Sequence, residues 1–152
     1  MPLAVKLGVV PILWNNDDVP ELTPDIPYSR VLDEMAQAGY AASELGSNYP
    51  QEPSVLRGEL AQRGMVLSGG YFCADYTDRQ THGSIVAQAE KKSRFLADAG
   101  AQYLVVADCL HPERVAVAGR AKLEHALSYE KFRAMADVLN EIARAADRAG
   151  LR

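Results

Sequence analysis

Six side chains that could bind a polyol or move a proton follow the strand-like segments of this chain: Trp14, Asn15, Glu44, Tyr71, Asp108 and His111. An indole such as Trp14 offers a sugar ring an apolar platform, and the Asn15 amide beside it can hydrogen-bond a hydroxyl group. The alternative for Trp14 is packing at the mouth of the fold. We predict that the six residues line a substrate site, and the pattern gives none of them a catalytic role.

Glu44 ends a short segment of small and apolar residues. A carboxylate in that position is costly unless it is paired or faces a polar cavity, so a role in the site is one explanation. The other is an ion pair with Lys6, Arg79 or another cation, which would shift the pKa of the carboxyl without making it catalytic. The sequence leaves both open.

Asp108, Cys109 and His111 form the one local group of acid, thiol and imidazole in the sequence. Their Asp-Cys-Leu-His spacing is not a recognised metal motif, and a tetrahedral site would need further ligands that the sequence does not assign. We therefore predict no metal ligand in this chain and expect Asp108 and His111 to line the substrate cavity. Cys73 and Cys109 are expected to be small buried residues, because no base is placed beside either thiol.

The elements that must position these residues alternate regularly. Four amphipathic stretches run into a glycine suited to a helix C-terminus: Gly39, Gly64, Gly100 and Gly150. Strands are predicted over residues 5–12, 40–45, 65–72 and 103–107, and helices over residues 28–38, 53–63, 84–99 and from the end of a loop at 108–127 onward. The last helix is the clearest, with an apolar stripe at Phe132, Met135, Leu139, Ile142 and Ala146.

Four consecutive βα units predict an α/β fold with parallel strands and right-handed crossovers. An open doubly wound sheet and half of a (βα)8 barrel both fit. The segment Pro11–Asn16 after the first strand lacks the glycines of a dinucleotide-binding turn, which favours the half-barrel. Gly69-Gly70 in the third strand would let another backbone or a ligand approach closely. Because no strand follows Gly150, residues 1–152 are predicted to be a single half-barrel domain that stops before strand five.

Composition limits the class of protein. The chain has 152 residues, 48% of them hydrophobic and 24% charged, which suits one soluble domain. A net charge of −4 gives no basic face for a phosphate backbone, so no nucleic-acid partner is expected. The apolar segments are too short to span a bilayer, and Met1–Leu13 is interpreted as a strand instead of a signal peptide. Two cysteines without a disulfide framework are typical of the reducing cytoplasm.

At this point the residues resemble a family. The segments that carry the resemblance are Pro11-Ile12-Leu13-Trp14-Asn15-Asn16-Asp17-Asp18, Pro20-Glu21-Leu22, Ile26-Pro27, Glu34-Met35-Ala36-Gln37-Ala38-Gly39-Tyr40 and Ser43-Glu44-Leu45-Gly46, with Gly64 to Phe72 further along. They are similar to the start of the inosose dehydratases, which belong to the xylose isomerase-like TIM barrels, the sugar phosphate isomerase and epimerase superfamily. The Trp-Asn-Asn-Asp-Asp segment is the most specific part.

The resemblance implies a metal-dependent lyase that dehydrates 2-keto-myo-inositol. In that chemistry a base removes the proton next to the ketone, and an acid helps the β-hydroxyl leave as water. The full-length family implies a divalent metal such as manganese, cobalt or magnesium, held by carboxylates and a histidine from strands five to eight. This chain, as the N-terminal half of that barrel, is therefore expected to hold no metal and to be inactive alone.

Other functions stay open. The chain is also compatible with a sugar isomerase or epimerase of the same superfamily, or with a non-catalytic half-barrel that self-associates. A relative of endonuclease IV is disfavoured by the acidic net charge. The expected partners are a small polyol or sugar and, because edge strands and the inner face of a half-barrel are exposed, a second copy or the missing half.

Overall fold

The computed structural model describes residues 5–17, 19, 21 and 26–152. Asp18, Pro20 and Leu22, which belong to the segments that carry the family resemblance, lie outside the described residues. The elements in chain order are β1 (Gly8–Val9), η1 (Pro11–Leu13), α1 (Tyr28–Gln37), β2 (Ala42–Ser43), α2 (Pro53–Ala61), β3 (Val66–Leu67), β4 (Gly69–Ala74), α3 (His82–Asp98), β5 (Tyr103–Asp108), α4 (Pro112–Val115), η3 (Leu123–His125) and α5 (Tyr129–Arg148).

The strands pair in parallel, as predicted for an α/β fold. β1, β2 and β3 form one sheet in that order, and β4 pairs with β5 in a second. The predicted third strand is therefore two strands: its first part, β3, pairs with β2, and its second part, β4, pairs with β5. The backbone ladder bridges the change: the Ser68 N–H donates to Ser43 O at 2.9 Å, and the Leu45 N–H donates to Gly69 O at 2.9 Å.

The first strand is shorter than predicted. β1 covers two residues, and Pro11 opens a 3₁₀ turn in place of the expected strand end. Proline lacks an N–H for the ladder and has the φ of a helical first turn. Its carbonyl accepts hydrogen bonds from the N–H groups of Trp14 at 2.8 Å and Asn15 at 3.0 Å. This turn sets the direction in which the two candidate side chains leave the sheet.

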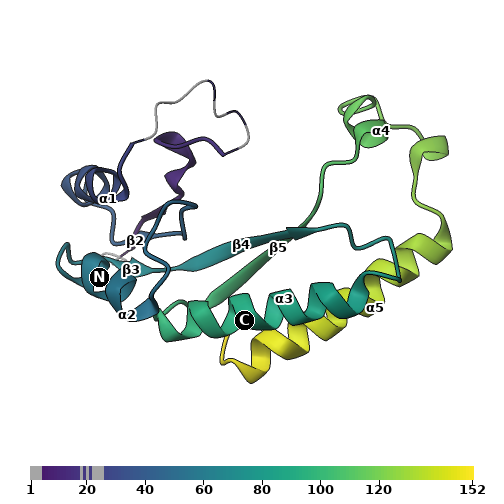
Figure 1. Ribbon diagram of the computed structural model, residues 1–152. Helices are drawn as coiled ribbons and strands as arrows, with labels where there is room; N and C mark the ends of the chain where they lie inside the picture. The colour runs from purple at the N-terminus through teal and green to yellow at the C-terminus, as the bar shows by residue number, and fades with distance from the viewer. Residues whose placement is uncertain (1–4, 18, 20, 22–25) are drawn as a thin grey trace.

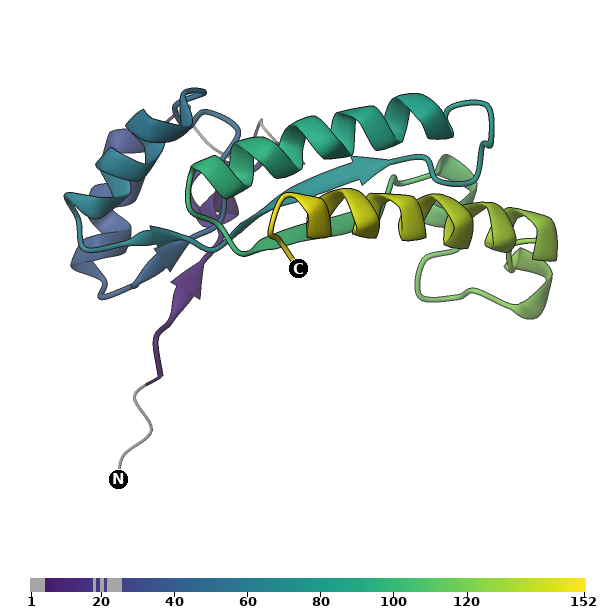
Figure 2. The ribbon, with the colours of Figure 1, turned by 90° about the horizontal axis from the view of Figure 1, so that it is seen from below.

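Helices α3 and α5 lie side by side along one face of β4 and β5 (Figures 1 and 2). Their layer is filled by Ile85, Ala89, Val138 and Ile142, against which Leu104 of β5 packs. The predicted stripe of α5 is rotated in part, since Phe132 is 62% exposed while the buried residues of the helix are Ala134, Val138, Ile142, Ala145 and Ala146. Three of the five buried residues are alanines.

The other face of β4 and β5 is open. Tyr71 lies opposite Val105 in the register, and these side chains are 54% and 44% exposed. Beyond the C-terminal end of β5 the chain continues into a segment with α4 that stands away from the helical layer (Figure 1). At the free edge of β5, Arg152 donates its N–H to Gln102 O at 2.9 Å and accepts from the Leu104 N–H at 3.1 Å.

The glycine signals are confirmed. Gly39 has a φ of 88° and Gly100 a φ of 91°, and the residue after each closes the helix by donating to the carbonyl of Met35 or Leu96. The Gly69-Gly70 pair admits protein, not ligand: a Cβ on Gly69 would lie 2.7 Å from the Tyr103 carbonyl oxygen, and one on Gly70 would lie 2.8 Å from Leu96 Cδ2. No helix in the described part of the chain is long and apolar enough to cross a membrane.

Candidate functional site

Two groups of polar residues lie at the C-terminal ends of the strands. The first, which we call the β1–β2 site, surrounds a cavity of about 310 Å³. Asn15, Glu44 and Tyr71 of the predicted set all line it, together with Asn48 and Ser47 from the loop after β2. The fold thus brings together Asn15 and Glu44, which follow β1 and β2, with Tyr71 from the middle of β4.

Trp14 is placed beside this group and is not among the residues that line the cavity. Its indole N–H donates to Glu34 Oε2 of α1 at 2.7 Å, and its ring packs against the main core cluster. Arg30 bonds the other oxygen of Glu34 at 2.8 Å, and the bonds from Arg30 and Trp14 lower the pKa of that carboxyl. This geometry fits the alternative interpretation, in which Trp14 packs as part of the fold; its bond to Glu34 also anchors the loop to the first helix.

The Asn15 amide ties the loop together. Its Nδ2 donates to Ile26 O at 2.8 Å, and its Oδ1 accepts from the Ile26 N–H at 3.0 Å. Both hydrogen bonds join the side chain to the backbone of one residue. Asn48 donates to the same carbonyl at 2.9 Å, and Ser47 donates to Asp17 at 2.7 Å. The amide of Asn15 therefore shapes the wall of the cavity, with one donor and one acceptor position engaged by Ile26.

Glu44 is the carboxyl group of this cavity. Burial raises its pKa, and no ion pair of Glu44 occurs in the part of the chain that the structure describes. Arg79, one of the cations considered as its partner, instead lies 2.8 Å from Asp137 on α5. An unpaired carboxyl that faces a cavity and resists ionisation is suited to donating or accepting a hydrogen bond from a substrate hydroxyl.

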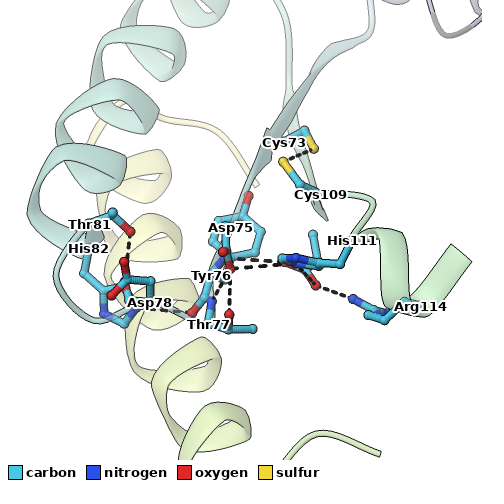
Figure 3. Close-up of polar contacts among 11 residues, drawn as sticks. Cys73, Asp75, Tyr76, Thr77, Asp78, Thr81, His82, Cys109, His111 and Arg114 are labelled. Atoms are coloured by element: carbon cyan, nitrogen blue, oxygen red, sulfur yellow. Dashed lines mark hydrogen bonds and ion pairs between the residues drawn. The ribbon is translucent and has the colours of Figure 1, made fainter. Parts of the chain in front are cut away.

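The second group, which we call the β4–β5 cluster, consists of Asp75, Asp108 and His111 (Figure 3). Asp75 follows β4, Asp108 ends β5, and His111 lies just before α4. His111 Nε2 is 3.6 Å from Asp108 Oδ2 and 3.7 Å from Asp75 Oδ1. Arg114 forms an ion pair with Asp108. Because parallel strands end at the same edge, residues 36 positions apart in sequence meet here.

Hydrogen bonds keep Asp75 ionised. Its Oδ1 accepts from the Thr77 hydroxyl at 2.7 Å and from the Thr77 N–H at 2.9 Å, and these bonds hold its pKa below the usual range. Asp108 accepts from the Tyr76 N–H at 3.4 Å and pairs with Arg114. The β4–β5 cluster thus holds a carboxyl whose pKa is lowered, Asp75, whereas the cavity holds one whose pKa is raised, Glu44.

The donor set fits a divalent cation. One atom of each of the three residues lies within 4.8 Å of the others, and two carboxylates with one imidazole are ligands that zinc and manganese accept. His111 Nε2 is buried without a hydrogen-bond partner among the described residues, although a buried ring nitrogen normally has one. Arg114 is the competitor, since a metal would share Asp108 with its guanidinium.

Sequence analysis did not find this ligand set. It predicted no metal ligand in this chain, because the spacing from Asp108 to His111 alone supplies two donors. The third, Asp75, comes from the neighbouring strand, and only the register of β4 on β5, with Ala74 opposite Asp108, brings it into place. The one available signal was that Asp75 and Asp108 both follow predicted strands.

The two thiols lie next to the cluster. Cys73 Sγ and Cys109 Sγ are 2.8 Å apart, Cys73 is exposed, and Cys109 is half-buried. The expectation that both are buried is therefore wrong; Cys73 points to the open face of the sheet pair, where nothing in the described chain covers it. The hydrogen bond with Cys73 and burial raise the pKa of the Cys109 thiol to about 11.

Comparison with known proteins now bears on these sites. No model of a known protein family matches the sequence. The chain is 38% identical over 105 residues to an inosose dehydratase of Geobacillus thermodenitrificans, and 31% identical over 148 residues to inosose dehydratase 2 of Bacillus cereus. The chain is related to the inosose dehydratases. The resemblance predicted from its sequence is confirmed.

The matches cover more of this chain than of its relatives. They cover 68% and 97% of this chain but 35% and 49% of those two dehydratases, so the chain spans about half the length of the curated relatives it matches, or less. What the two names say of activity is established for those relatives.

Solved structures that share this fold include a sugar epimerase and a zinc-containing protein. Psicose 3-epimerase of Clostridium cellulolyticum matches with a TM-score of 0.68 at 13% identity, over 97% of this chain and 50% of the epimerase. The IolI protein, solved with a zinc atom, matches with a TM-score of 0.62 at 16% identity, over 97% of this chain and 50% of that one. Identities this low show the fold alone: an α/β fold of the xylose isomerase-like TIM-barrel kind.

Proposed function

We propose that this chain is one half of a (βα)8 barrel and that the complete barrel is a metal-dependent lyase that dehydrates 2-keto-myo-inositol. The observation that carries the proposal is the 31% identity to a named inosose dehydratase across 97% of this chain. The coverage of 49% of that relative and the open face of β4 and β5 support a half-barrel.

The residues of this chain have separate tasks in the proposed reaction. Glu44, whose pKa is raised by burial, faces the cavity and hydrogen-bonds a hydroxyl of the cyclitol. Asn48 and Tyr71 line the same cavity and limit the size of the ring that enters. Asp75, Asp108 and His111 are the groups that would hold a divalent cation, which when bound polarises the ketone and stabilises the enediolate.

A direct assay tests the proposal. The 152-residue chain and a chimera, in which it replaces the matching half of Bacillus cereus inosose dehydratase 2, are given 2-keto-myo-inositol with Mn²⁺, Co²⁺ or Mg²⁺. We expect the chimera to release water and form the α-diketone only with metal, and the chain alone to form none. A chimera with native circular dichroism that leaves the substrate intact would contradict the proposal.

The same assay separates the main alternative. A sugar isomerase or epimerase of this superfamily would rearrange the substrate without loss of water, so mass spectrometry of the product distinguishes the two reactions. Dehydration is favoured because the named relatives at 31–38% identity are dehydratases, while the epimerase is matched at 13%.

We further propose that the isolated chain pairs with a second copy or with the complementary half-barrel. The open face carries Tyr71 and Val105 at 54% and 44% exposure, and Val66 on β3 is 61% exposed. Apolar surface of this kind favours association. A monodisperse monomer in light scattering at micromolar concentration would contradict it.

Both cysteines are thiols, which supports a cytoplasmic location.

A further inference from the structure

The two cysteines of this chain are held in contact by the sheet. Cys73 lies near the end of β4 and Cys109 directly follows β5, and the register places Cys73 opposite Ala107. The Cys109 N–H donates to Ala74 O at 3.1 Å, so the backbone ladder continues past both residues. Their Sγ atoms are 2.8 Å apart and point toward one another (Figure 3). The contact is thus fixed by strand pairing and not by a loop.

The pair is also accessible. Cys73 is exposed on the open face of the sheet pair, while Cys109 beside it is half-buried. Free cysteine is among the most buried residue types, so an exposed thiol in contact with a second one is unusual. A small oxidant can reach Cys73, and Cys109 is already placed to react with the product.

Metal chelation by the two thiols fits less well. Two sulfurs on one tetrahedral zinc lie about 3.7 Å apart, given Zn–S bonds of about 2.3 Å. At 2.8 Å the sulfurs are closer than that and nearer to the distance of about 2.05 Å in a disulfide. Neither sulfur is part of the Asp75, Asp108 and His111 group.

We propose that Cys73 and Cys109 are a redox modification site that forms a reversible intrachain disulfide with hydroperoxides. The Cys73 sulfur attacks one oxygen of hydrogen peroxide, the O–O bond breaks, and Cys73 becomes a sulfenic acid with release of one water. The Cys109 sulfur then attacks the Cys73 sulfur, and the sulfenic oxygen leaves as a second water with the Cys109 proton. Two thiols are oxidised and one peroxide is reduced to two waters.

A low-molecular-weight dithiol reverses the bond by two exchange steps, which return both thiols and oxidise the dithiol. Transient disulfides of this kind are the form in which disulfides occur in reducing compartments. Cys109 lies between Asp108 and His111 in sequence, so the crosslink joins the end of β4 to the segment that carries the β4–β5 cluster.

The test uses the full reduced chain and one equivalent of hydrogen peroxide. Because the chain has only two cysteines, intact mass and a thiol count follow the reaction without ambiguity. We expect loss of two hydrogens, loss of both thiols, a crosslinked Cys73–Cys109 peptide and full recovery with dithiothreitol. The folded chain should react at least about tenfold faster than the chain in guanidinium chloride, where the contact is lost.

Matched variants assign the two steps. Cys109→Ser should stop at the sulfenic acid and give a dimedone adduct on Cys73, while wild type gives the disulfide and no adduct. Cys73→Ser should consume peroxide at least about tenfold more slowly, since the exposed sulfur is absent. The proposal is overturned if wild type yields only crosslinks between chains or sulfinic acid, if folding does not speed the reaction, or if the adduct forms on Cys109 in preference.

Discussion

The β1–β2 site and the β4–β5 cluster occupy the same position in the fold, at the C-terminal ends of parallel strands, yet they hold their carboxyl groups in opposite ways. Glu44 is partly buried with no ion-pair partner in the described chain, and its pKa is raised. Asp75 accepts two hydrogen bonds from Thr77, and its pKa is lowered. Strand-end position therefore brings a carboxyl to the site, and its local surroundings decide whether its pKa is raised or lowered.

The loops of the two sites differ as well. At the β1–β2 site the Trp14 indole donates to Glu34 and the Asn15 amide is hydrogen-bonded to Ile26. These hydrogen bonds hold the loop in place. At the β4–β5 cluster His111 Nε2 is buried without a hydrogen bond to any described residue, and Cys73 and Cys109 remain thiols. The hydrogen bonds of the β1–β2 site thus shape a cavity. At the β4–β5 cluster the His111 imidazole and the two thiols can still react or bind a ligand.

The largest effect is expected for cation binding at the β4–β5 cluster. His111→Ala should weaken binding of Mn²⁺ about 100-fold or more in titration calorimetry, because one of three ligands is lost. His125→Ala is the matched control, since this histidine lines a cavity of about 480 Å³ together with His111 and Arg114 but is not one of the three clustered donors found among the described residues. An equal loss of Mn²⁺ affinity in both variants, or no loss in His111→Ala, would contradict a cation site at the β4–β5 cluster.

The junction between the two sites should be nearly as sensitive. Gly69→Ala places a Cβ 2.7 Å from the Tyr103 carbonyl oxygen, and the backbone of β5 cannot move aside without loss of pairing. We expect a loss of about 1–3 kcal/mol in urea unfolding. Gly70→Ala should cost less, because its Cβ meets the flexible end of Leu96. The reverse order would show that β4 does not pack on β5 as described.

The two carboxyl groups should respond to pH with opposite sign. Asp75→Asn should lower thermal stability at neutral pH, and the loss should shrink as pH falls through the depressed pKa of Asp75, below its usual 3.8. Glu44→Gln should raise stability at neutral pH, because a raised pKa costs stability as pH rises from 4.5 through the folded value. Thermal melts of each variant and of wild type measure both effects. Changes in melting temperature of the same sign at neutral pH would contradict the opposite pKa shifts of the two carboxyl groups.

The smallest effect concerns Trp14, the one tryptophan of the chain. Trp14→Phe removes the indole bond to Glu34 and should cost about 1 kcal/mol. Since the ring packs on the core, 2-keto-myo-inositol should leave wild-type tryptophan emission unchanged at concentrations that saturate the chain. Quenching that saturates with the ligand would restore the sequence-based prediction that the indole contacts substrate.

Periodicity and glycine positions were enough to predict the parallel α/β fold. Helices α1, α2 and α3 begin and end within about two residues of the predicted positions. The division of the third strand was not predictable, because it depends on the change of neighbour from β2 to β5 and not on the residues of the strand itself. The orientation of α5 was predicted only in part, because three of its five buried residues are alanines, which carry little hydrophobic signal.

The site was predicted in part for a similar reason. The sequence shows which residues lie near strand ends, so Asn15, Glu44 and Tyr71 were expected on one side of the fold; they line one cavity, and their contact with substrate stays a prediction. It does not show what a side chain bonds to, so the commitment of Trp14 and Asn15 to loop structure was not visible. The meeting of Asp75 with His111, and of Cys73 with Cys109, depends on strand register, which only the fold supplies.

The central claim is that this chain carries one side of a keto-inositol site, with a shaped cavity and a charged cluster at adjoining strand ends. The most direct test is a titration of the isotope-labelled chain with 2-keto-myo-inositol, followed in ¹H–¹⁵N correlation spectra. We predict that the shifted amides are those of the cavity, led by Glu44, Asn48 and Tyr71, with helices α3 and α5 unaffected. Shifts confined to those helices, or no shift at millimolar ligand, would contradict the account.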